Sequence, residues 1–429
     1  MKVAIVGYGV EGESAYKYWD AKGADITIFD ESDNPKLSVP DGVTLIAGKG
    51  ALSQLHGYDI IMRVPALRPS KIKTDGQITS ATREFFKVCP APIIGVTGTK
   101  GKGTTSTLIY DLLQKAGIKT HLAGNIGMPM LDLLPDIKSD HVVVLELSSF
   151  QLWDLNISPH IAVVLMIEPE HLDVHKDFEE YMTAKANIAK WQKPDDVVIY
   201  NPKNDVSERI ANMSAGKKIA YGSMQAAHVK GDDIFVGQTF ICKLGDVKVP
   251  GKHNIENICA ALTASWQIVQ NATALKQAIQ DFTGLPHRIE LVREVGGVKY
   301  YDDSFSSAPG AAVVAAQAFS EPKVMVLGGF DRNLSLDGMA QRVLKSGLKK
   351  ALLIGHTSAK LQKIFADQGA TNKIEVLGDK VTMAQIVKKC SESAQPGDVV
   401  ILSPGAPSFD MFKDFTDRGE QFKREVELL

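Results

Sequence analysis

The sequence lacks several features that mark specialised classes of protein. Its four cysteines, among 429 residues, are scattered without a CxxC pair, which argues against a disulfide framework and a structural zinc site. No run of about 18 apolar residues, the length that spans a membrane, occurs, and no signal-peptide cleavage region follows the N-terminal MKVAIVGYG. The formal net charge is −2, so no excess of basic residues favours nucleic acid. We therefore expect a cytoplasmic globular protein without a nucleic-acid or membrane partner.

The length suggests about three domains, at roughly 150 residues per domain. In the first, β-branched runs alternate with a helix-like stretch: VAIVGYG, EGESAYKYWDAKG, DITIFD and YDIIMRV. This alternation predicts a parallel sheet with crossover helices. Pro90 and Pro92 interrupt the chain after REFFKV. We therefore predict a Rossmann-like domain over residues 1–90.

A second predicted domain, residues 91–283, opens with the strand IIGVT, a glycine loop and a helix with one apolar face, TTSTLIYDLLQKAG. The continuous apolar runs VVVLEL and IAVVLMI are typical of parallel strands buried on both faces. The more polar runs VVIY, KIAYG, HVKGDDIFVG and ICKLGDVKVP are interpreted as a small antiparallel flank, followed by a helix from about Asn254 to Val269. The pattern predicts a domain with a parallel sheet like that of P-loop ATPases.

The third predicted domain covers residues 284–429. The strand-like runs KYYDD, VMVLGG, ALLIG, IEVLG and VVILSP are separated by helical stretches such as PGAAVVAAQAF. This alternation again predicts a Rossmann-like sheet. The expected fold class is therefore α/β, with three domains.

The stretch GYGVEG (7–12) lies between a predicted strand and a predicted helix, and Asp30 ends the next strand. Its spacing matches GxGxxG, in which glycines let the backbone approach a diphosphate at a helix N-terminus. Asp30 could accept a hydrogen bond from a ribose hydroxyl or a base. The pattern predicts a bound nucleotide diphosphate, and it leaves open a redox dinucleotide and a tight turn without a ligand.

A second glycine loop, GVTGTKGKGTTS (95–106), departs from the P-loop pattern because Gly103 follows Lys102 where a hydroxyl is usual. The amides of residues 98–103 can still form an anion-binding nest at a helix N-terminus, and Lys102 supplies a charge for phosphate. We expect ATP phosphates here. Thr104, or alternatively Thr105, would then replace the absent hydroxyl as a magnesium ligand.

Acidic and imidazole side chains follow two of the predicted strands. Glu146 ends VVVLEL, and EPEHLDVH follows IAVVLMI with Glu168, Glu170, His171, Asp173 and His175. The carboxyl ends of parallel strands meet at one edge of a sheet, where ligands bind. Carboxylates beside a phosphate loop favour magnesium, whereas zinc would need a third ligand at matching spacing.

Together these motifs resemble the Mur ligases of peptidoglycan synthesis from end to end, and within them the branch that adds D-glutamate. The resemblance rests on GYGVEG, TGTKGK, GNIG, ELSSFQL, EPEHLDVH with TAKANI, GKHNIEN, LPHRIE, GGFDR and LSPGAPSFDMFKDFTDRGEQF. It implies a monomeric ATP-dependent amide ligase that joins D-glutamate to UDP-N-acetylmuramoyl-L-alanine through an acyl phosphate. It also implies two magnesium ions and a carbamylated Lys185.

The resemblance also implies roles for individual residues. The catalytic residues would be Lys102, Glu146, His171 and Lys185, and the metal ligands Thr104, Glu146, His171 and Lys185. ATP would be bound by Gly98, Thr99, Lys100, Gly101, Lys102, Gly103, Thr104, Asn254, Asn257, Arg288 and Asp303. The UDP substrate would be bound by Val10, Glu11, Asp30, Asn125, Ser148 and Gln151. D-glutamate would be bound by Ser307, Arg332, Ser408, Phe409 and Phe415.

The sequence departs from the family pattern at three places. Phe305 stands where a lysine is usual, Arg332 replaces another lysine, and RVPALRP (63–69) replaces an SPG-type turn. These departures leave open a Mur-type or folylpolyglutamate-type ligase with another acceptor amino acid. A nucleotide-binding homologue without catalysis is a further alternative. An oxidoreductase would use GYGVEG but leave TGTKGKGTT without a role.

Overall fold

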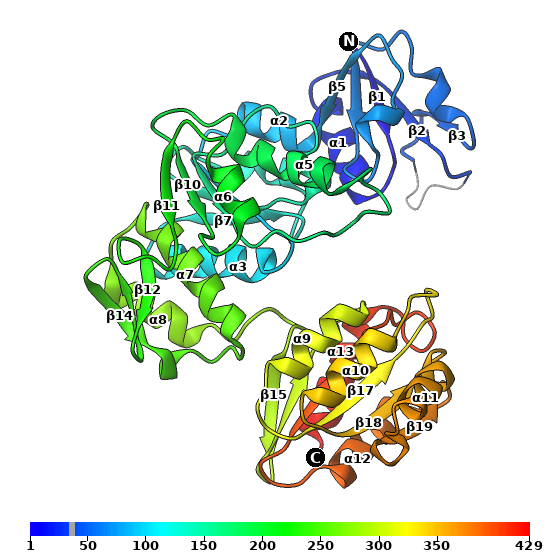
Figure 1. The fold of residues 1–429 in the computed structure, drawn as a ribbon. Helices are drawn as coiled ribbons and strands as arrows, with labels where there is room; N and C mark the ends of the chain where they lie inside the picture. The colour runs from blue at the N-terminus through cyan, green and yellow to red at the C-terminus, as the bar shows by residue number, and fades with distance from the viewer. Residues whose placement is uncertain (34–38) are drawn as a thin grey trace. The chain divides into compact units, whose positions relative to one another are not determined.

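The computed structural model describes residues 1–33 and 39–429, which form two units (Figure 1). Unit 1 contains Met1–Asp246 and Ile255–Gln280, and unit 2 contains Val247–Asn254 and Asp281–Leu429. Unit 1 holds two parallel sheets and a small antiparallel sheet, and unit 2 holds one mixed sheet. The predicted α/β fold class is confirmed. The domain boundaries near residues 90 and 283 stay a prediction.

The first sheet of unit 1 has the strand order β3-β2-β1-β4-β5, all parallel, which is the order of the Rossmann fold. Alternate residues of β1 face different layers: Val3 and Ile5 pack toward α1, and Ala4 and Val6 toward η1. The strands are β1 (Lys2–Val6), β2 (Asp25–Asp30), β3 (Thr44–Ala47), β4 (Ile60–Arg63) and β5 (Gln77–Ser80). The helices are α1 (Val10–Asp20), η1 (Ala51–Gln54), η2 (Pro69–Lys71) and α2 (Ala81–Val88).

The second sheet has the order β11-β10-β9-β6-β8-β7 and is also parallel. Its strands are β6 (Ile93–Thr97), β7 (Thr120–Gly124), β8 (Val142–Glu146), β9 (Ile161–Val164), β10 (Val197–Tyr200) and β11 (Lys217–Ala220). Its helices are α3 (Lys102–Lys115), η3 (Met130–Asp136), α4 (Ser149–Leu152), α5 (Phe178–Lys190) and α6 (Asp205–Ala211). In the centre of the sheet, β6 lies between β8 and β9. The glycine loop that follows β6 therefore lies at the carboxyl edge of the sheet, between the ends of β8 and β9.

The interpretation of VVIY and KIAYG as antiparallel strands was wrong. They form β10 and β11, which extend the parallel sheet beside β9. Only the later runs form the antiparallel sheet, as β12 (Ala227–Lys230), β13 (Asp233–Val236) and β14 (Thr239–Lys243). The polarity of β11 misled the prediction because an edge strand exposes side chains whatever the direction of its pairing. The short η4 (Leu244–Asp246), α7 (Lys252–Trp266) and α8 (Ala272–Asp281) follow; α7 begins and ends a little earlier than predicted.

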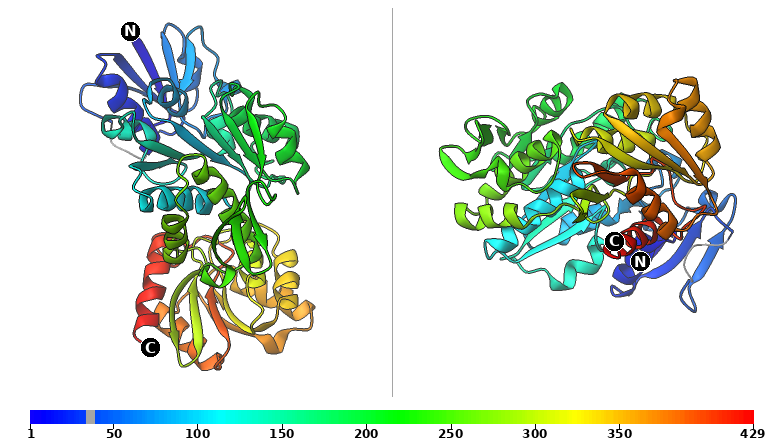
Figure 2. Two further views of the ribbon diagram at one scale, coloured as in Figure 1. Left: turned by 90° about the vertical axis from the view of Figure 1, so that its left-hand side faces the viewer. Right: turned by 90° about the horizontal axis from the view of Figure 1, so that it is seen from below.

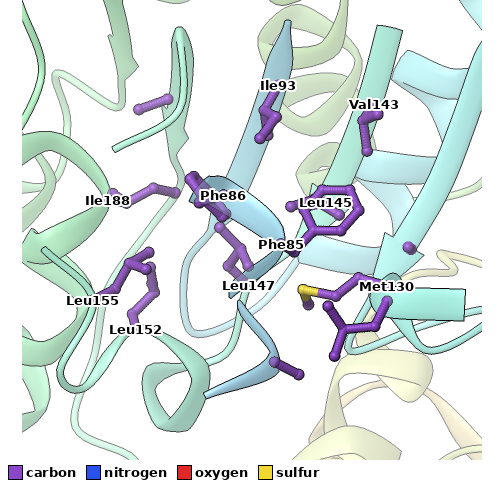
Figure 3. Close-up of a cluster of buried hydrophobic side chains, with 14 of the residues drawn as sticks. Phe85, Phe86, Ile93, Met130, Val143, Leu145, Leu147, Leu152, Leu155 and Ile188 are labelled. Carbon is purple, nitrogen blue, oxygen red and sulfur yellow. The ribbon is translucent and has the colours of Figure 1, made fainter. Parts of the chain in front are cut away.

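The two parallel sheets of unit 1 share one buried apolar cluster. Phe85 of α2 lies in this cluster with Leu145 of β8 and Met130 of η3 (Figure 3). Val3 and Ile5 of the first sheet belong to the same cluster. Residues on both sides of the predicted boundary near 90 therefore pack into a common core.

Unit 2 is built on the sheet β15-β16-β20-β17-β18-β19, in which β15 pairs antiparallel and the others parallel. Helices α9–α11 pack on one face and α12 and α13 on the other; α13 is red in Figure 2. The strands are β15 (Glu290–Val295), β16 (Val298–Asp302), β17 (Lys323–Gly328), β18 (Leu348–Ile354), β19 (Ile374–Gly378) and β20 (Val399–Leu402). The helices are α9 (Pro309–Gln317), α10 (Asp337–Lys345), α11 (Ser358–Asp367), η5 (Thr371–Lys373), α12 (Met383–Ser393) and α13 (Phe415–Glu427). The parallel part matches the prediction, and β15 is an antiparallel edge strand that the pattern did not reveal.

Over residues 1–33 and 39–429, no helix has the length and apolar character needed to span a membrane.

Candidate active site

The glycine loop after β6 lies close to helix α7. Gly101 precedes α3 with φ of 84°, a left-handed conformation that glycine adopts without strain. A Cβ at Gly101 would lie 2.4 Å from Oδ1 of Asn257 on α7. The loop therefore requires glycine for both its conformation and its closeness to Asn257. These two predicted ATP-binding positions are adjacent in the structure.

Two lysine side chains converge on the carbonyl oxygen of Gly98. Lys102 Nζ donates to this oxygen and to the oxygen of Thr99, both at 3.0 Å. Lys185 Nζ, from α5, donates to the oxygen of Gly98 at 2.9 Å. The family resemblance implied both lysines for one site, although 83 positions separate them, and the structure brings both amines to the loop after β6.

Lys185 is buried and sits near the face of Tyr181, with Nζ 4.7 Å from the ring centroid. Loss of hydration lowers the pKa of Lys185 well below its ordinary value, and repulsion from Lys102 lowers it further. Glu170 and Glu146 act in the opposite direction. The side chain is therefore held in surroundings that favour a neutral amine. Tyr181, which also contacts Thr99 Oγ1 at 3.1 Å, was missed because an aromatic residue in a helix usually signals core.

Glu146 ends β8, beside β6 and β7, with its side chain buried. Its Oε1 accepts from Nδ2 of Asn125 at 3.0 Å, so a predicted metal ligand and a predicted substrate residue are paired. Ser148 and Gln151 form a reciprocal cap at the start of α4. Gln151 thus has a structural role that the sequence interpretation did not assign to it.

His171 lies in the exposed loop between β9 and α5, with φ of 56° and its ring centroid 5.0 Å from that of Phe150. His175 is instead buried, stacks on Phe150 and contacts Ser149 Oγ at 3.0 Å through Nε2. Burial lowers the pKa of His175 despite the opposing charge of Glu180. Of these two histidines, His171 is therefore the accessible one.

The GYGVEG turn also has the geometry expected for close backbone packing. A Cβ at Gly12 would lie 2.2 Å from the carbonyl oxygen of Gly7. The Asp30 carboxylate accepts a hydrogen bond from the amide of Tyr8 at 2.9 Å and so stabilises the turn. Val10 is exposed, whereas burial, followed by repulsion from Asp132, raises the pKa of Glu11.

In unit 2, the predicted amino-acid residues follow three adjacent parallel strands, β16, β20 and β17. Ser307 follows β16, Arg332 follows β17, and Ser408, Phe409 and Phe415 follow β20. Ser408 is buried, Phe409 and Phe415 are exposed, and Arg332 is also exposed. The topology therefore brings their segments to one edge of the sheet.

A buried arginine that the sequence did not single out ties these segments together. Arg418 of α13 donates to the carbonyl oxygens of Ser304 at 2.8 Å and Ala406 at 3.2 Å, and its Nε donates to Ser304 Oγ at 2.9 Å. Ser304 Oγ in turn donates to the oxygen of Phe415. No local pattern marks Arg418, because its partners lie more than ten residues away.

The remaining predicted nucleotide residues, Asn254, Arg288 and Asp303, belong to unit 2. Asn254 donates to the oxygen of Pro250 at 2.7 Å. Asp303 is buried, which raises its pKa to about 7 although Ser403 donates to it at 2.6 Å. Within the described part of the chain, a close group of potential metal ligands is formed by His287, Glu290 and Asp302. Lys423 Nζ lies 2.7 Å from a carboxylate oxygen of Glu290, so this cluster already contains a cation that pairs with one of its carboxylates.

Comparison with known proteins agrees with this architecture. The Mur ligase middle domain matches residues 96–265, and the glutamate ligase domain of Mur ligases matches residues 287–405. The UDP-N-acetylmuramoylalanine–D-glutamate ligase of Acetivibrio thermocellus is 39% identical over 99% of this chain and 96% of its own. The enzyme of the same name from Clostridium botulinum is 36% identical over 100% and 97%, respectively.

Solved structures share the fold at low sequence identity. The UDP-N-acetylmuramate-alanine ligase of Thermotoga maritima has a TM-score of 0.60 at 14% identity, with 100% of this chain and 99% of that chain covered. Folylpolyglutamate synthase of Mycobacterium tuberculosis, complexed with ADP, has a TM-score of 0.56 at 14% identity, with 76% and 91% covered. The resemblance predicted from the motifs is confirmed. The chain belongs to the Mur ligases, a family of ATP-dependent ligases that form amide bonds.

Proposed function

We propose that this chain joins D-glutamate to UDP-N-acetylmuramoyl-L-alanine with hydrolysis of ATP to ADP and phosphate, in the cytoplasmic phase of peptidoglycan synthesis. The observation that carries the chemistry is the convergence of Lys102 and Lys185 on Gly98, next to the strand that ends in Glu146. The names of the full-length relatives support the choice of substrates. The glycine turn, with Val10, Glu11 and Asp30, would receive the UDP group.

The reaction would proceed in two balanced steps. An oxygen of the L-alanine carboxylate attacks the γ-phosphorus, the bond from that phosphorus to the β–γ bridging oxygen breaks, and ADP leaves. The amine of D-glutamate then attacks the acyl carbon, phosphate leaves, and the amine gives up a proton. Loop amides and Lys102 would bind phosphate oxygens, and His171 would accept the amine proton only while it does not bind metal. Ser307, Arg332, Ser408, Phe409 and Phe415 would hold D-glutamate.

The residues around the loop fit magnesium, which prefers oxygen ligands. Glu146 offers a buried carboxylate at the carboxyl edge of the sheet, and Thr104 a hydroxyl at the start of α3. Two such ions, when bound, would offset charge on the phosphates. Their ligands would be Thr104, Glu146, His171 and a carbamylated Lys185.

Carbamylation of Lys185 is part of the proposal. The reaction requires a neutral amine, which attacks CO2, forms a C–N bond and loses a proton to leave an anionic carbamate. The lowered pKa of Lys185, caused mainly by loss of hydration, favours that neutral amine. Carbamylation would convert this neutral amine into an anion that attracts metal.

Phosphate release tests the proposed function directly. We expect release only when ATP, UDP-N-acetylmuramoyl-L-alanine and D-glutamate are all present, with L-glutamate and other amino acids much less active. Omission of each component in turn is the control. Release with another amino acid would assign a different acceptor, and release with none would contradict the ligase proposal.

The hydroxyl that replaces the usual P-loop residue is identified by a pair of variants. Thr104→Ala should lower magnesium-dependent turnover by about tenfold or more, because Thr104 is partly exposed at the loop. Thr105→Ala should lower it less, since Thr105 is fully buried in α3. Initial rates over a magnesium titration make the comparison. The reverse ranking would assign the ligand to Thr105.

A further inference from the structure

Within unit 2, the guanidinium of Arg288 lies over the ring of Phe305. The guanidinium carbon lies 3.9 Å from the centroid of the Phe305 ring, a close cation–π contact. Phe305 is 42% exposed, so its ring is not simply part of the apolar core. It packs on Phe415 in an edge-to-face arrangement, with ring centroids 5.0 Å apart at 80°. The Phe305 ring thus contacts both the guanidinium of Arg288 and the ring of Phe415.

The backbone that carries Arg288 is held in an unusual conformation. The residues on either side of it, His287 and Ile289, have φ of 61° and 47°, which non-glycine residues rarely adopt. Hydrogen bonds fix both: the amide of His287 donates to Glu290 at 2.8 Å, and the amide of Ile289 to Asp303 at 3.2 Å. The surrounding contacts therefore determine where the Arg288 side chain leaves the backbone.

Phe305 is fixed to the same segment through its own backbone. Its amide donates to the carbonyl oxygen of His287 at 3.0 Å. The ring and the guanidinium are therefore held by two segments that are joined through this backbone hydrogen bond. A long arginine side chain loses rotamer freedom when it is ordered, and a ring that orders it beforehand reduces that cost on binding.

We propose that Phe305 is a positioning residue for nucleotide binding, which orders the side chain of Arg288 for contact with a nucleotide phosphate. Stacking uses the face of the guanidinium, whereas phosphate oxygens are bound by N–H groups along its edge. Both contacts are thus compatible in one conformation. The inference rests on the proposed function and on the contact of Arg288 with ATP that the family resemblance implies, and it adds Phe305 to the residues that serve nucleotide binding.

The test is a double-mutant cycle with ADP binding measured by calorimetry and KM for ATP measured from phosphate release. Phe305→Leu should weaken ADP binding and raise KM for ATP about three- to fivefold, with kcat little changed. Phe305→Tyr should retain wild-type affinity because the aromatic face remains. Phe305→Lys should weaken binding more than leucine does, because it sets an ammonium against the guanidinium. Phe330→Leu, which removes another exposed aromatic ring of unit 2, is the matched control.

Repeating Phe305→Leu in an Arg288→Lys background distinguishes an effect on the position of the Arg288 guanidinium from a general effect on packing. Arg288→Lys retains a charge but removes the planar group, so Phe305→Leu should have little further effect on affinity in this background. Equal effects of Phe305→Leu in both backgrounds, or equal affinities of the leucine and tyrosine variants, would overturn the inference alone. Failure of the wild-type protein to bind ADP would overturn the proposed function and this inference with it.

Discussion

Replacing Lys185 by methionine is expected to abolish most ligase turnover, by about a thousandfold, without lowering the stability of the fold. Lys185 is buried beside the phosphate loop, and loss of hydration lowers its pKa. If its carbamate binds magnesium, methionine removes one ligand from the metal site. A loss of roughly 4 kcal/mol of transition-state stabilisation corresponds to this factor. Steady-state phosphate release measures it.

The same substitution should not lower the free energy of unfolding, although it abolishes most turnover. Methionine has similar length and no charge, so it removes the cost of burying an amine, and urea unfolding should show unchanged stability or a gain of about 1 kcal/mol. Lys190→Met, on the exposed side of the same helix, is the control for the substitution itself. Depletion of CO2 should slow the wild-type enzyme but not the methionine variant. Near-normal turnover of Lys185→Met would refute a catalytic role for this amine.

The phosphate loop was predictable from sequence because its chemistry is local. Glycines, Lys102 and the first helical hydroxyls occupy consecutive positions between an apolar strand and an amphipathic helix. The topology of open parallel sheets then places Glu146 at the same edge, since β8 pairs directly with β6. The short-range pattern and one rule of sheet topology therefore predicted the place of this loop and of Glu146 in the fold, while ATP binding there stays a prediction.

Contacts made by single long side chains between distant segments were not predictable. RVPALRP appeared only as a departure from the family turn, yet its Arg63 lies fully buried against Asp154, 91 residues away. Arg68 of the same stretch pairs with Glu180. Phe305 likewise seemed to be a lost cation, whereas the structure shows the guanidinium of Arg288 over its ring. Arginine partners and aromatic stacks depend on three-dimensional placement that no local spacing encodes.

The Arg63–Asp154 pair leads to the largest expected effect on stability. Arg63 Nε donates to Asp154 at 2.9 Å, Nη2 donates to the same carboxylate, and the remaining contacts are backbone carbonyls, including Phe150 at 3.1 Å. The Arg63 side chain is 0% exposed. Asp154→Ala should therefore lower the free energy of unfolding by about 3–5 kcal/mol, because a buried cation loses its counter-ion. The melting temperature should fall by about 5 °C.

A second arginine–carboxylate pair in the same unit supplies the matched control. Arg209 binds Glu179 through two hydrogen bonds, at 2.6 and 3.0 Å, but both side chains are more than half exposed, at 55% and 59%. Glu179→Ala should therefore cost less than about 1 kcal/mol. The double variant Arg63→Met/Asp154→Leu should recover much of the stability lost in Asp154→Ala, because it leaves no buried charge without a partner. Equal losses in the free energy of unfolding for Asp154→Ala and Glu179→Ala would contradict the prediction, because they would show that burial of the arginine does not increase the cost of losing its carboxylate partner.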